Sequence, residues 1–169
     1  MTSEYSSVAV LLAAHNGMMW LEEQIESILS QKSILVKIFI SVDFSNDKTY
    51  DWCQNLAKKN TRVNVLPYGN TFGGAAKNFF HLIQNVDFLG FDYISLADQD
   101  DIWNDEKLHY AIETIKMEDL DGYSSNVIAF WSNGRKKLVK KSFPQKKFDY
   151  YFEAAGPGCT YVFKQQAIQ

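Results

Sequence analysis

Three carboxylates within four positions are the strongest chemical signal in this sequence. Asp98, Asp100 and Asp101 directly follow the strand-like residues 93–97. Two unit charges about 4 Å apart repel by about 4 kcal/mol at an effective dielectric constant near 20. Because water alone relieves such repulsion poorly where a buried strand ends, a bound divalent cation is the economical answer. We therefore expect a metal site held by Asp98 and Asp100. Hard oxygen ligands favour Mn²⁺ or Mg²⁺.

In a simpler interpretation, the acidic residues cap the helix that is expected to begin near Trp103. A carboxylate in the first turn of a helix is stabilised by about 0.3–1 kcal/mol through the helix dipole. This reading accounts for Asp105 and Glu106. It accounts poorly for Asp98, which precedes that helix by a full turn. On the residues alone both readings stay open.

Strand-like and helix-like segments alternate around these carboxylates. Apolar segments predict strands at residues 8–14, 37–42, 63–66 and 93–97. Helical spacing of apolar residues predicts helices at residues 18–31, around 52–56, at 75–85 and around 108–115. This order predicts an α/β fold with right-handed βαβ units and a mainly parallel, Rossmann-like sheet with helices on both faces. Further strands at 127–131 and 160–163 predict a smaller α+β C-terminal half. Trp20 and Phe79 are expected in the core.

Polar residues follow three of the expected strands, at residues 15–17, 43–47 and 98–101. In open α/β sheets, ligands bind outside the carboxyl ends of the strands. These three segments should therefore converge on one rim of the sheet. There Asp43 would accept hydrogen bonds from a base or a sugar, beside a metal held by Asp98 and Asp100.

Composition and charge narrow the class of protein. The 169 residues suit one domain, and a net charge of −3 gives no electrostatic reason to bind nucleic acid. No apolar run approaches the roughly 20 residues that a membrane span needs, and the N-terminus lacks a basic signal region. Cys53 and Cys159 match no metal or redox spacing, which favours a reduced, cytoplasmic compartment.

Seven of the seventeen basic residues lie between Arg135 and Lys147. They could meet the phosphates of a lipid-linked acceptor or an anionic membrane surface. A solvated loop is the preferred reading, because Phe143, Pro144 and Phe148 interrupt any clean amphipathic face. Peripheral association with the inner face of a membrane and a homo-oligomer are left open.

Five motifs in a fixed order resemble one known family. They are Ala-Ala-His-Asn-Gly closing the strand of residues 8–17, Ser-Ile-Leu-Ser-Gln at 27–31, Val-Asp-Phe-Ser-Asn-Asp-Lys-Thr at 42–49, Asp-Gln-Asp-Asp-Ile-Trp at 98–103 and Gly-Cys-Thr at 158–160. Together they resemble glycosyltransferase family 2, the inverting nucleotide-sugar transferases, and the fourth motif looks like the bacterial rhamnosyltransferase-like branch. The resemblance implies the GT-A fold over residues 1–169. Residues 1–121 would form the nucleotide-sugar-binding half, and residues 122–169 would form part of an acceptor half that looks truncated.

The resemblance implies that one group of residues contacts the nucleotide. The loop after the first strand, with Ala14, His15 and Asn16, and the carboxylate of Asp43 would meet the base and the ribose. Val42 and Phe44 replace an aspartate and a glycine of the family pattern, so base recognition would be altered or weaker.

A second group would serve the diphosphate, the metal and the acceptor. Asp98 would face the ribose and the metal, and Asp100 would bind Mn²⁺ or Mg²⁺ directly. Lys77 falls where the family often has a basic residue near the nucleotide, with a solvated helix lysine as the equal alternative. Gly158 lies in the segment that would line the acceptor side.

The family's catalytic base has no counterpart here before Gln169. Asp149 and Glu153 are the only carboxylates after Asp121, and surface charge is the preferred reading for both. The expected function is metal-dependent transfer of a sugar from a UDP- or dTDP-linked donor, with rhamnose as one candidate. The acceptor would be a saccharide or lipid-linked saccharide in bacterial surface polysaccharide synthesis. The alternative is a nucleotide-sugar-binding module without turnover.

Overall fold

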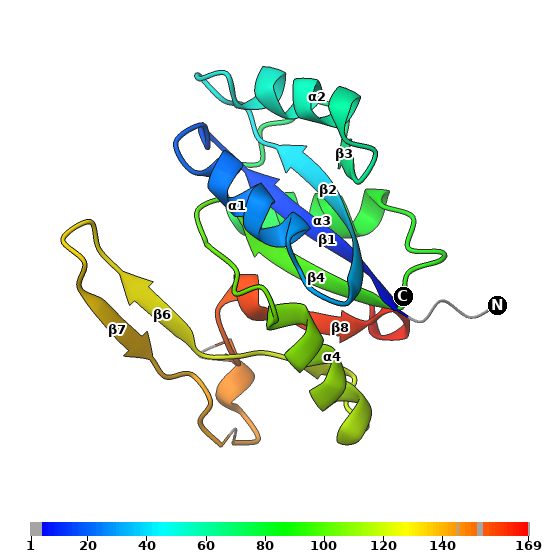
Figure 1. The fold of residues 1–169 in the computed structure, drawn as a ribbon, viewed down its shortest axis with the longest axis vertical. Helices are drawn as coiled ribbons and strands as arrows, with labels where there is room; N and C mark the ends of the chain where they lie inside the picture. The colour runs from blue at the N-terminus through cyan, green and yellow to red at the C-terminus, as the bar shows by residue number, and fades with distance from the viewer. Residues whose placement is uncertain (1–4, 145, 152–153, 169) are drawn as a thin grey trace.

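The computed structural model describes residues 5–144, 146–151 and 154–168. Its main sheet has six strands in the order β3-β2-β1-β4-β8-β5 (Figure 1). The strands are β1 (Ser6–Ala14), β2 (Ile34–Val42), β3 (Val63–Val65), β4 (Tyr93–Asp98), β5 (Gly122–Tyr123) and β8 (Val162–Lys164). Strands β1, β2, β3 and β4 are parallel to one another, and β8 is antiparallel to both β4 and β5. The predicted α/β fold with a mainly parallel sheet is confirmed.

Both faces of the sheet are covered by helices. The helices are α1 (Leu21–Leu29), α2 (Thr49–Lys59), α3 (Ala75–Asn85) and α4 (Lys107–Met117). In β1, Val10 and Leu12 pack in the core cluster with residues of α1, α2 and α4, whereas Ala9 and Leu11 pack in the cluster with α3. Because successive side chains of a strand point to opposite faces, a strand covered twice needs the continuous apolar run seen here.

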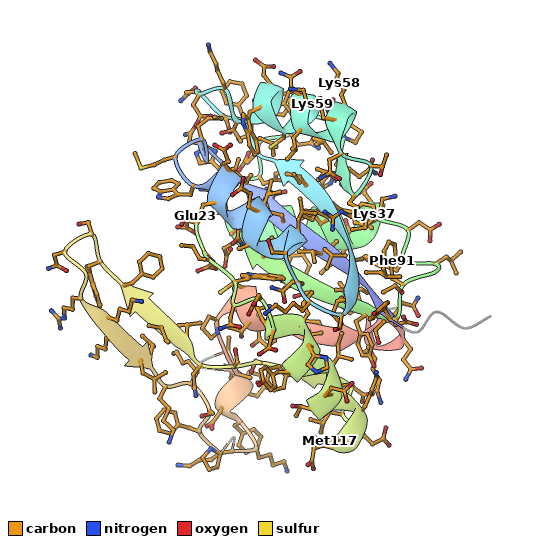
Figure 2. All side chains as sticks on the ribbon, viewed as in Figure 1. Glu23, Lys37, Lys58, Lys59, Phe91 and Met117 are labelled. Atoms are coloured by element: carbon orange, nitrogen blue, oxygen red, sulfur yellow. The ribbon has the colours of Figure 1, made fainter. Side chains whose placement is uncertain are left out.

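Charged side chains lie on the outer surfaces of α1 and α2. Lys58 and Lys59 point outward from the last turn of α2, and Glu23 is exposed in the first turn of α1 (Figure 2). These charges have the signs that the two ends of a helix dipole favour. The chain therefore has ordinary amphipathic helices, and none in the described residues is long and apolar enough to cross a bilayer.

The first helix begins later than predicted. The carbonyl of Gly17 accepts hydrogen bonds from the N–H groups of Trp20 and Leu21, each at 3.0 Å, so a turn precedes α1. Trp20 therefore lies at the N-cap, outside the helical repeat, and is 42% exposed. The prediction of a core position for Trp20 is wrong, whereas Phe79 packs against the α3-side core as expected.

The C-terminal half also departs from the predicted boundaries. Strand β6 (Val127–Phe130) pairs with β7 (Lys136–Val139) in a separate antiparallel hairpin. Residues 136–139 of the basic segment are therefore a strand and not the predicted solvated loop. This strand is held by pairing with β6, which the apolar pattern of the sequence does not predict. Three short 3₁₀ helices, η1 (Asp149–Tyr151), η2 (Gly158–Thr160) and η3 (Gln165–Ala167), complete the described chain.

Candidate functional site

The carboxyl ends of β1, β2 and β4 lie side by side and open into a cavity of about 490 Å³. The parallel register places Ala14 beside Val42 and Ala13 beside Asp98, so the segments that follow these strands share one rim. The cavity is lined by Ala13, Ala14, His15, Asp43, Phe44, Thr71, Gly73, Gly74, Ala75, Asn78, Asp98, Gln99 and Asp100. The three polar segments expected to converge on one rim do so.

Five of the predicted site residues line this cavity, namely Ala14, His15, Asp43, Asp98 and Asp100. Three others are not among the lining residues. The side-chain oxygen of Asn16 accepts the backbone N–H of Asn46 at 2.8 Å and so holds the loop after β2. Lys77 is exposed on α3. Gly158 adjoins Asp98, since a Cβ atom at Gly158 would lie 3.7 Å from Oδ2 of that carboxylate.

Asp43 holds the loop on the far side of the cavity. Its carboxylate accepts the backbone N–H groups of Phe44 at 2.7 Å, Phe72 at 2.9 Å and Gly73 at 3.0 Å. Burial alone would raise the pKa of Asp43, but the N–H groups of Phe72, Phe44 and Gly73 outweigh it and hold the pKa below its usual value. Asp43 is therefore an anion with three of about four acceptor positions in use.

Gln99 joins the loops after β1 and β4 across the floor of the site. The backbone N–H of His15 donates to Oε1 of Gln99 at 2.7 Å, and Nε2 of Gln99 donates to the carbonyl of His15 at 2.9 Å. A Cβ atom at position 17 would lie 2.5 Å from the same Oε1, so a larger residue there would displace the Gln99 side chain from its hydrogen bonds. Gly17 is therefore explained by the close approach of Gln99, a contact that sequence reasoning did not predict.

The segment 71–75 and the first turn of α3 form another wall that sequence reasoning did not assign to the site. Gly73 and Gly74 both have positive φ angles, of 69° and 158°, which glycine adopts readily. Asn78 is buried, its Nδ2 donates to the carbonyl of Ser41 at 3.0 Å, and its Oδ1 has no hydrogen-bond partner among the described residues. The signal available in the sequence was the Gly-Gly pair before a helix, since helix N-termini bind anions.

Asp98 lies at the centre of the acidic cluster. Burial, then Asp101 and Asp100, raise its pKa to about 6, while the backbone N–H of Cys159 opposes this by hydrogen bonding. Burial also raises the pKa of Asp101, whose carboxyl contacts the Cys159 thiol and whose Oδ2 has no partner among the described residues. One ligand atom from each of Asp98, Asp101 and Cys159 lies within 4.8 Å of the other two. The predicted repulsion is present in the fold.

The segment that carries Cys159 was expected to line the acceptor side, but the contact of the Cys159 thiol with the carboxylates was not predicted, because they lie far apart in the sequence. Strand β8 pairs with β4 in antiparallel register, and η2 immediately before it carries Cys159 to the carboxyl end of β4. Burial raises the pKa of the Cys159 thiol, and the neighbouring Asp101 raises it further. Cys159 is therefore a neutral thiol packed against the acidic cluster.

The buried amine of Lys107 lies close to Asp101 and Cys159. Its Nζ lies 3.5 Å from the centre of the Trp103 ring and has no hydrogen-bond partner among the described residues. Burial lowers the pKa of Lys107 to about 7, and Cys159 and Asp101 oppose that shift. Trp103 is part of the core on the side of α1 and α4. Asp101 and Lys107 thus interact electrostatically, while burial makes the charged form of the Lys107 amine costly.

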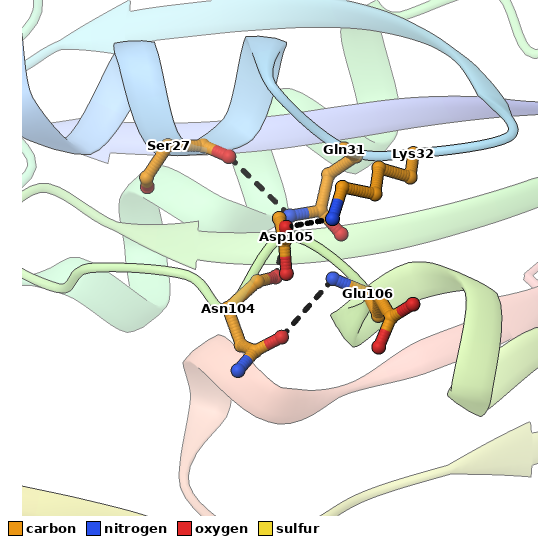
Figure 3. A network of polar contacts seen from close by, with 6 residues as sticks. All are labelled: Ser27, Gln31, Lys32, Asn104, Asp105 and Glu106. Carbon is orange, nitrogen blue, oxygen red and sulfur yellow. Dashed lines mark hydrogen bonds and ion pairs between the residues drawn. The ribbon is translucent and has the colours of Figure 1, made fainter.

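The C-terminal end of α1 clamps the loop that follows the carboxylates (Figure 3). Nε2 of Gln31 donates to the carbonyl of Asn104 at 2.7 Å, and its Oε1 accepts the N–H of Leu108 at 2.9 Å. Ser27 Oγ accepts the N–H of Trp103 at 3.0 Å. The side chains of Ser27 and Gln31 in the motif at residues 27–31 therefore hold the loop that joins β4 to α4.

The side-chain capping expected of the acidic residues is not seen at Glu106. Helix α4 begins at Lys107, and its N-cap Glu106 makes no side-chain capping hydrogen bond. Asp105 instead forms an ion pair with Lys32 at the end of the clamp (Figure 3). Asp98 and Asp100 are left outside both the cap and the clamp, on the wall of the cavity.

Of the two predicted metal ligands, only Asp98 belongs to the group whose ligand atoms lie within 4.8 Å of one another, and its partners there are Asp101 and Cys159 rather than Asp100. Asp98 and Asp100 both line the cavity, the pKa of Asp98 is raised partly by its neighbouring carboxylates, and Asp101 Oδ2 is an unpartnered acceptor close by. A cation would favour the ionised form of Asp98 and relieve the repulsion. Carboxylate oxygens in a cavity open to a ligand suit Mn²⁺ or Mg²⁺.

Asp149 lies away from this cavity. Its Oδ2 accepts the backbone N–H of Lys146, three residues before η1, at 2.8 Å, and it is not among the lining residues. Glu153, the other carboxylate considered as a catalytic base, lies outside the described residues. Within the described chain, the carboxylates that line the cavity are Asp43, Asp98 and Asp100.

Comparisons with known proteins agree with this architecture. Residues 9–165 match the family model of glycosyl transferase family 2. The chain is 48% identical over 158 residues to the dTDP-rhamnosyl transferase RfbG of Shigella flexneri, covering 93% of this chain and 55% of that protein. It is 27% identical over 115 residues to the glycosyltransferase GlyG of Streptococcus pneumoniae, covering 68% of this chain and 36% of that protein.

Solved structures show the same fold at low sequence identity. S. aureus TarS 1-349 superposes with a TM-score of 0.66 at 17% identity, covering 94% of this chain and 47% of that one. The mannosyltransferase PcManGT from Pyrobaculum calidifontis, in complex with GDP-Man and Mn²⁺, gives 0.66 at 13% identity, covering 97% and 46%. The chain thus has the GT-A fold and spans between about a third and about half of the length of the proteins named here.

Proposed function

Because the chain belongs to glycosyl transferase family 2, we propose that it forms the donor-binding part of a metal-dependent glycosyltransferase. The reaction would transfer a sugar from a nucleoside diphosphate to the hydroxyl of a saccharide acceptor. One observation carries the proposal: a cavity at the carboxyl ends of β1, β2 and β4 whose wall includes Asp43, Asp98 and Asp100. Ligands bind at this position in open α/β sheets.

The walls of the cavity offer different chemistry to the parts of such a donor. The base and the ribose would lie between His15 and Asp43, whose remaining acceptor position suits an N–H or O–H group. The diphosphate would lie towards Gly73 and Gly74, where the first turn of α3 presents backbone N–H groups. Asn16 and Lys77 support this arrangement only indirectly, the first by holding the loop after β2 and the second from the surface of α3.

Asp98 and Asp100 would hold the cation, which we propose to be Mn²⁺ or Mg²⁺. When bound, it would supply positive charge that stabilises a departing diphosphate. Asp101 is turned towards Lys107 and Cys159 and would shape the loop. Gly158, next to Asp98, leaves room beside the carboxylate where the sugar or the acceptor would approach.

The donor is proposed to be dTDP-linked, with rhamnose as the sugar. Support comes from the relative described as a dTDP-rhamnosyl transferase, which is 48% identical over nearly the whole of this chain. The UDP-linked alternative rests on the fold alone, since the TarS structure with UDP-GlcNAc is 17% identical. We further propose a saccharide or lipid-linked saccharide acceptor, polysaccharide synthesis as the process, and the cytoplasmic face of a membrane as the location.

A second candidate function is donor binding without turnover. It is favoured by the state of the described carboxylates: Asp43 already accepts three backbone N–H groups, and Asp98 and Asp100 form the proposed metal site. A general base that deprotonates the acceptor hydroxyl typically contributes about 10²–10⁴-fold to the rate. Without such a base, the chain would bind the donor and turn it over slowly.

Incubation with dTDP-rhamnose and Mn²⁺ tests these functions by measuring dTDP release, with and without a saccharide acceptor. The transferase proposal predicts acceptor-dependent release that Asp100→Asn abolishes and that Asp51→Asn, an exposed carboxylate on α2, leaves unchanged. Donor binding without release would favour the second function. Release that Asp100→Asn does not alter would contradict the site itself.

A further inference from the structure

The β6–β7 hairpin exposes an apolar face. Its register pairs Ile128 with Leu138 and Phe130 with Lys136. Directly paired residues, and residues two apart on one strand, point to the same side of a sheet. Ile128, Phe130 and Leu138 therefore share one face, and they are 61%, 55% and 60% exposed. Clustered exposed apolar side chains of this kind mark an interaction surface.

The same hairpin starts the most basic segment of the chain. Residues 135–147 contain seven lysines and arginines and no acidic residue, whereas the other ten basic residues of the chain accompany all twenty acidic ones. Strand β7 and the residues after it are largely exposed. A strongly cationic surface therefore adjoins the apolar face on a protein whose net charge is negative.

Aromatic rings and cations are interleaved along this segment. The Arg135 guanidinium lies 5.0 Å from the centre of the Trp131 ring, and Trp131 is 44% exposed. Lys140 Nζ lies 5.2 Å from the Phe143 ring, and Lys147 Nζ lies 5.4 Å from the Phe148 ring. Aromatic rings beside cations are enriched where proteins meet the headgroup region of a bilayer.

We propose that the β6–β7 hairpin and the basic segment 135–147 bind the surface of an anionic phospholipid membrane. Ile128, Phe130 and Leu138 would enter the headgroup region, while the cations would meet lipid phosphates. Each lysine or arginine near such a surface contributes about 1 kcal/mol, which corresponds to about fivefold in partitioning. Only the purpose of this membrane binding, which is to bring the site close to a lipid-linked acceptor, rests on the proposed function.

The position of the hairpin suits that purpose. In Figure 1 its tip lies on the same side of the molecule as the carboxyl ends of β1 and β4, where the cavity opens. A molecule held to a bilayer through the hairpin would therefore keep the cavity near the lipid surface. β6 and β7 pack mainly against each other, so they can enter an interface without disturbing the main sheet.

Two other partners fit the surface less well. Nucleic acid would satisfy the cations, but Ile128 and Leu138 would gain little from a phosphate backbone. A second copy of the chain joined through the same face would bring two cationic segments together, and like charges repel. The combination of aliphatic and cationic residues is the observation that favours a membrane.

Vesicle flotation tests the proposal with phosphatidylcholine vesicles, alone or with a third of the lipid replaced by phosphatidylglycerol. We expect binding to the anionic vesicles only, weakened by salt. The double substitution Ile128→Ser with Leu138→Ser should abolish it, whereas Leu89→Ser with Met117→Ser should not. Leu89 and Met117 are 78% and 75% exposed outside the hairpin and form the matched control.

A second pair of variants tests the charges. Lys136→Gln with Lys137→Gln should lower partitioning about 25-fold, two factors of about five, while Lys58→Gln with Lys59→Gln on α2 should change it far less. Equal loss in both pairs would overturn the proposal, as would binding to RNA without vesicle binding, or a dimer that only the Ile128→Ser/Leu138→Ser variant disrupts. Binding of dTDP with Mn²⁺ is measured on the same variants. Loss of vesicle binding with dTDP binding intact concerns the membrane surface alone, whereas absence of dTDP binding in every variant and in the native protein contradicts the proposed function.

Discussion

The parallel strands β1, β2 and β4 and the hairpin β6–β7 differ in what determines their residues. In β1 every residue from Val8 to Ala14 is buried, because helices cover both faces of the sheet. In the hairpin, by contrast, Ile128, Phe130 and Leu138 remain more than half exposed. The contrast shows that packing among the described residues explains the first region, whereas it does not explain the exposed apolar residues of the second.

The site lies at the boundary between these two kinds of region. Asp98 ends a buried strand, and burial with neighbouring carboxylates raises its pKa. The surrounding loop is nevertheless fixed by Ser27 and Gln31 on one side and by Gln99 on another. The mutually repelling carboxylates are thus held close together by hydrogen bonds from neighbouring segments, as expected of a preorganised ligand site.

The largest effect should come from the core of β1. Leu12→Ala, at a fully buried position, should lower the free energy of unfolding by about 3 kcal/mol, because the lost side chain leaves a cavity. Leu138→Ala in the hairpin should change it by no more than about 0.5 kcal/mol. Urea denaturation of both variants checks this, and similar losses would erase the distinction between the two regions.

Asp43→Ala should have the next largest effect. It removes the acceptor for the N–H groups of Phe44, Phe72 and Gly73, so the wall of the cavity loses its anchor. We expect a loss of about 2 kcal/mol in stability, within the range for unsatisfied buried donors. Hydrogen exchange should show faster exchange of the Phe72 and Gly73 amides. Unchanged protection there would show that the loop is held by other contacts.

Asp98→Asn should have a smaller effect that depends on pH. A carboxyl whose pKa is raised in the fold is costly to ionise there, so metal-free protein loses stability as the pH rises from about 4 to about 6. The amide avoids this cost. In metal-free buffer the variant should melt above the native protein at pH 7.5 and together with it below pH 4. A variant that melts lower at pH 7.5 would refute the repulsion.

The smallest effect on the folded core should come from cutting the hairpin segment. Residues 135–147 offer seven trypsin sites, and the described residues of this segment are largely exposed, whereas the lysines of α2 lie in a helix. Limited trypsinolysis should therefore cut this segment first, leaving the melting of the remaining fold nearly unchanged. First cleavage inside residues 49–59 would contradict the proposed difference in local stability.

The order of strands and helices along the chain could be predicted because each depends on the apolar pattern of its own residues. A doubly covered strand needs an apolar run, and the polar residue that ends each run, such as Asp43 or Asp98, marks the rim. Trp20 was misplaced because a turn at Gly17 delays the start of α1. The predicted carboxylates of the site do line the cavity, but their roles stay predictions.

The missing parts of the site depend on contacts between distant segments. Gln99 meets Gly17 across two strands, and Cys159 reaches Asp101 only because β8 pairs with β4. Asn78 lines the cavity because α3 lies over the end of β2. The spacing of residues in a single sequence does not encode such contacts. The polar segments at the strand ends could therefore be predicted, whereas most of the side chains that hold them in place could not.

The most direct measurement of the central claim is a calorimetric titration of dTDP-rhamnose into the protein with Mn²⁺ and into metal-free protein. The account predicts binding that requires Mn²⁺, that Asp98→Asn or Asp100→Asn abolishes, and that Asp51→Asn preserves. Binding of equal strength without the metal, or in the Asp98→Asn and Asp100→Asn variants, would contradict a nucleotide-sugar site built on these carboxylates.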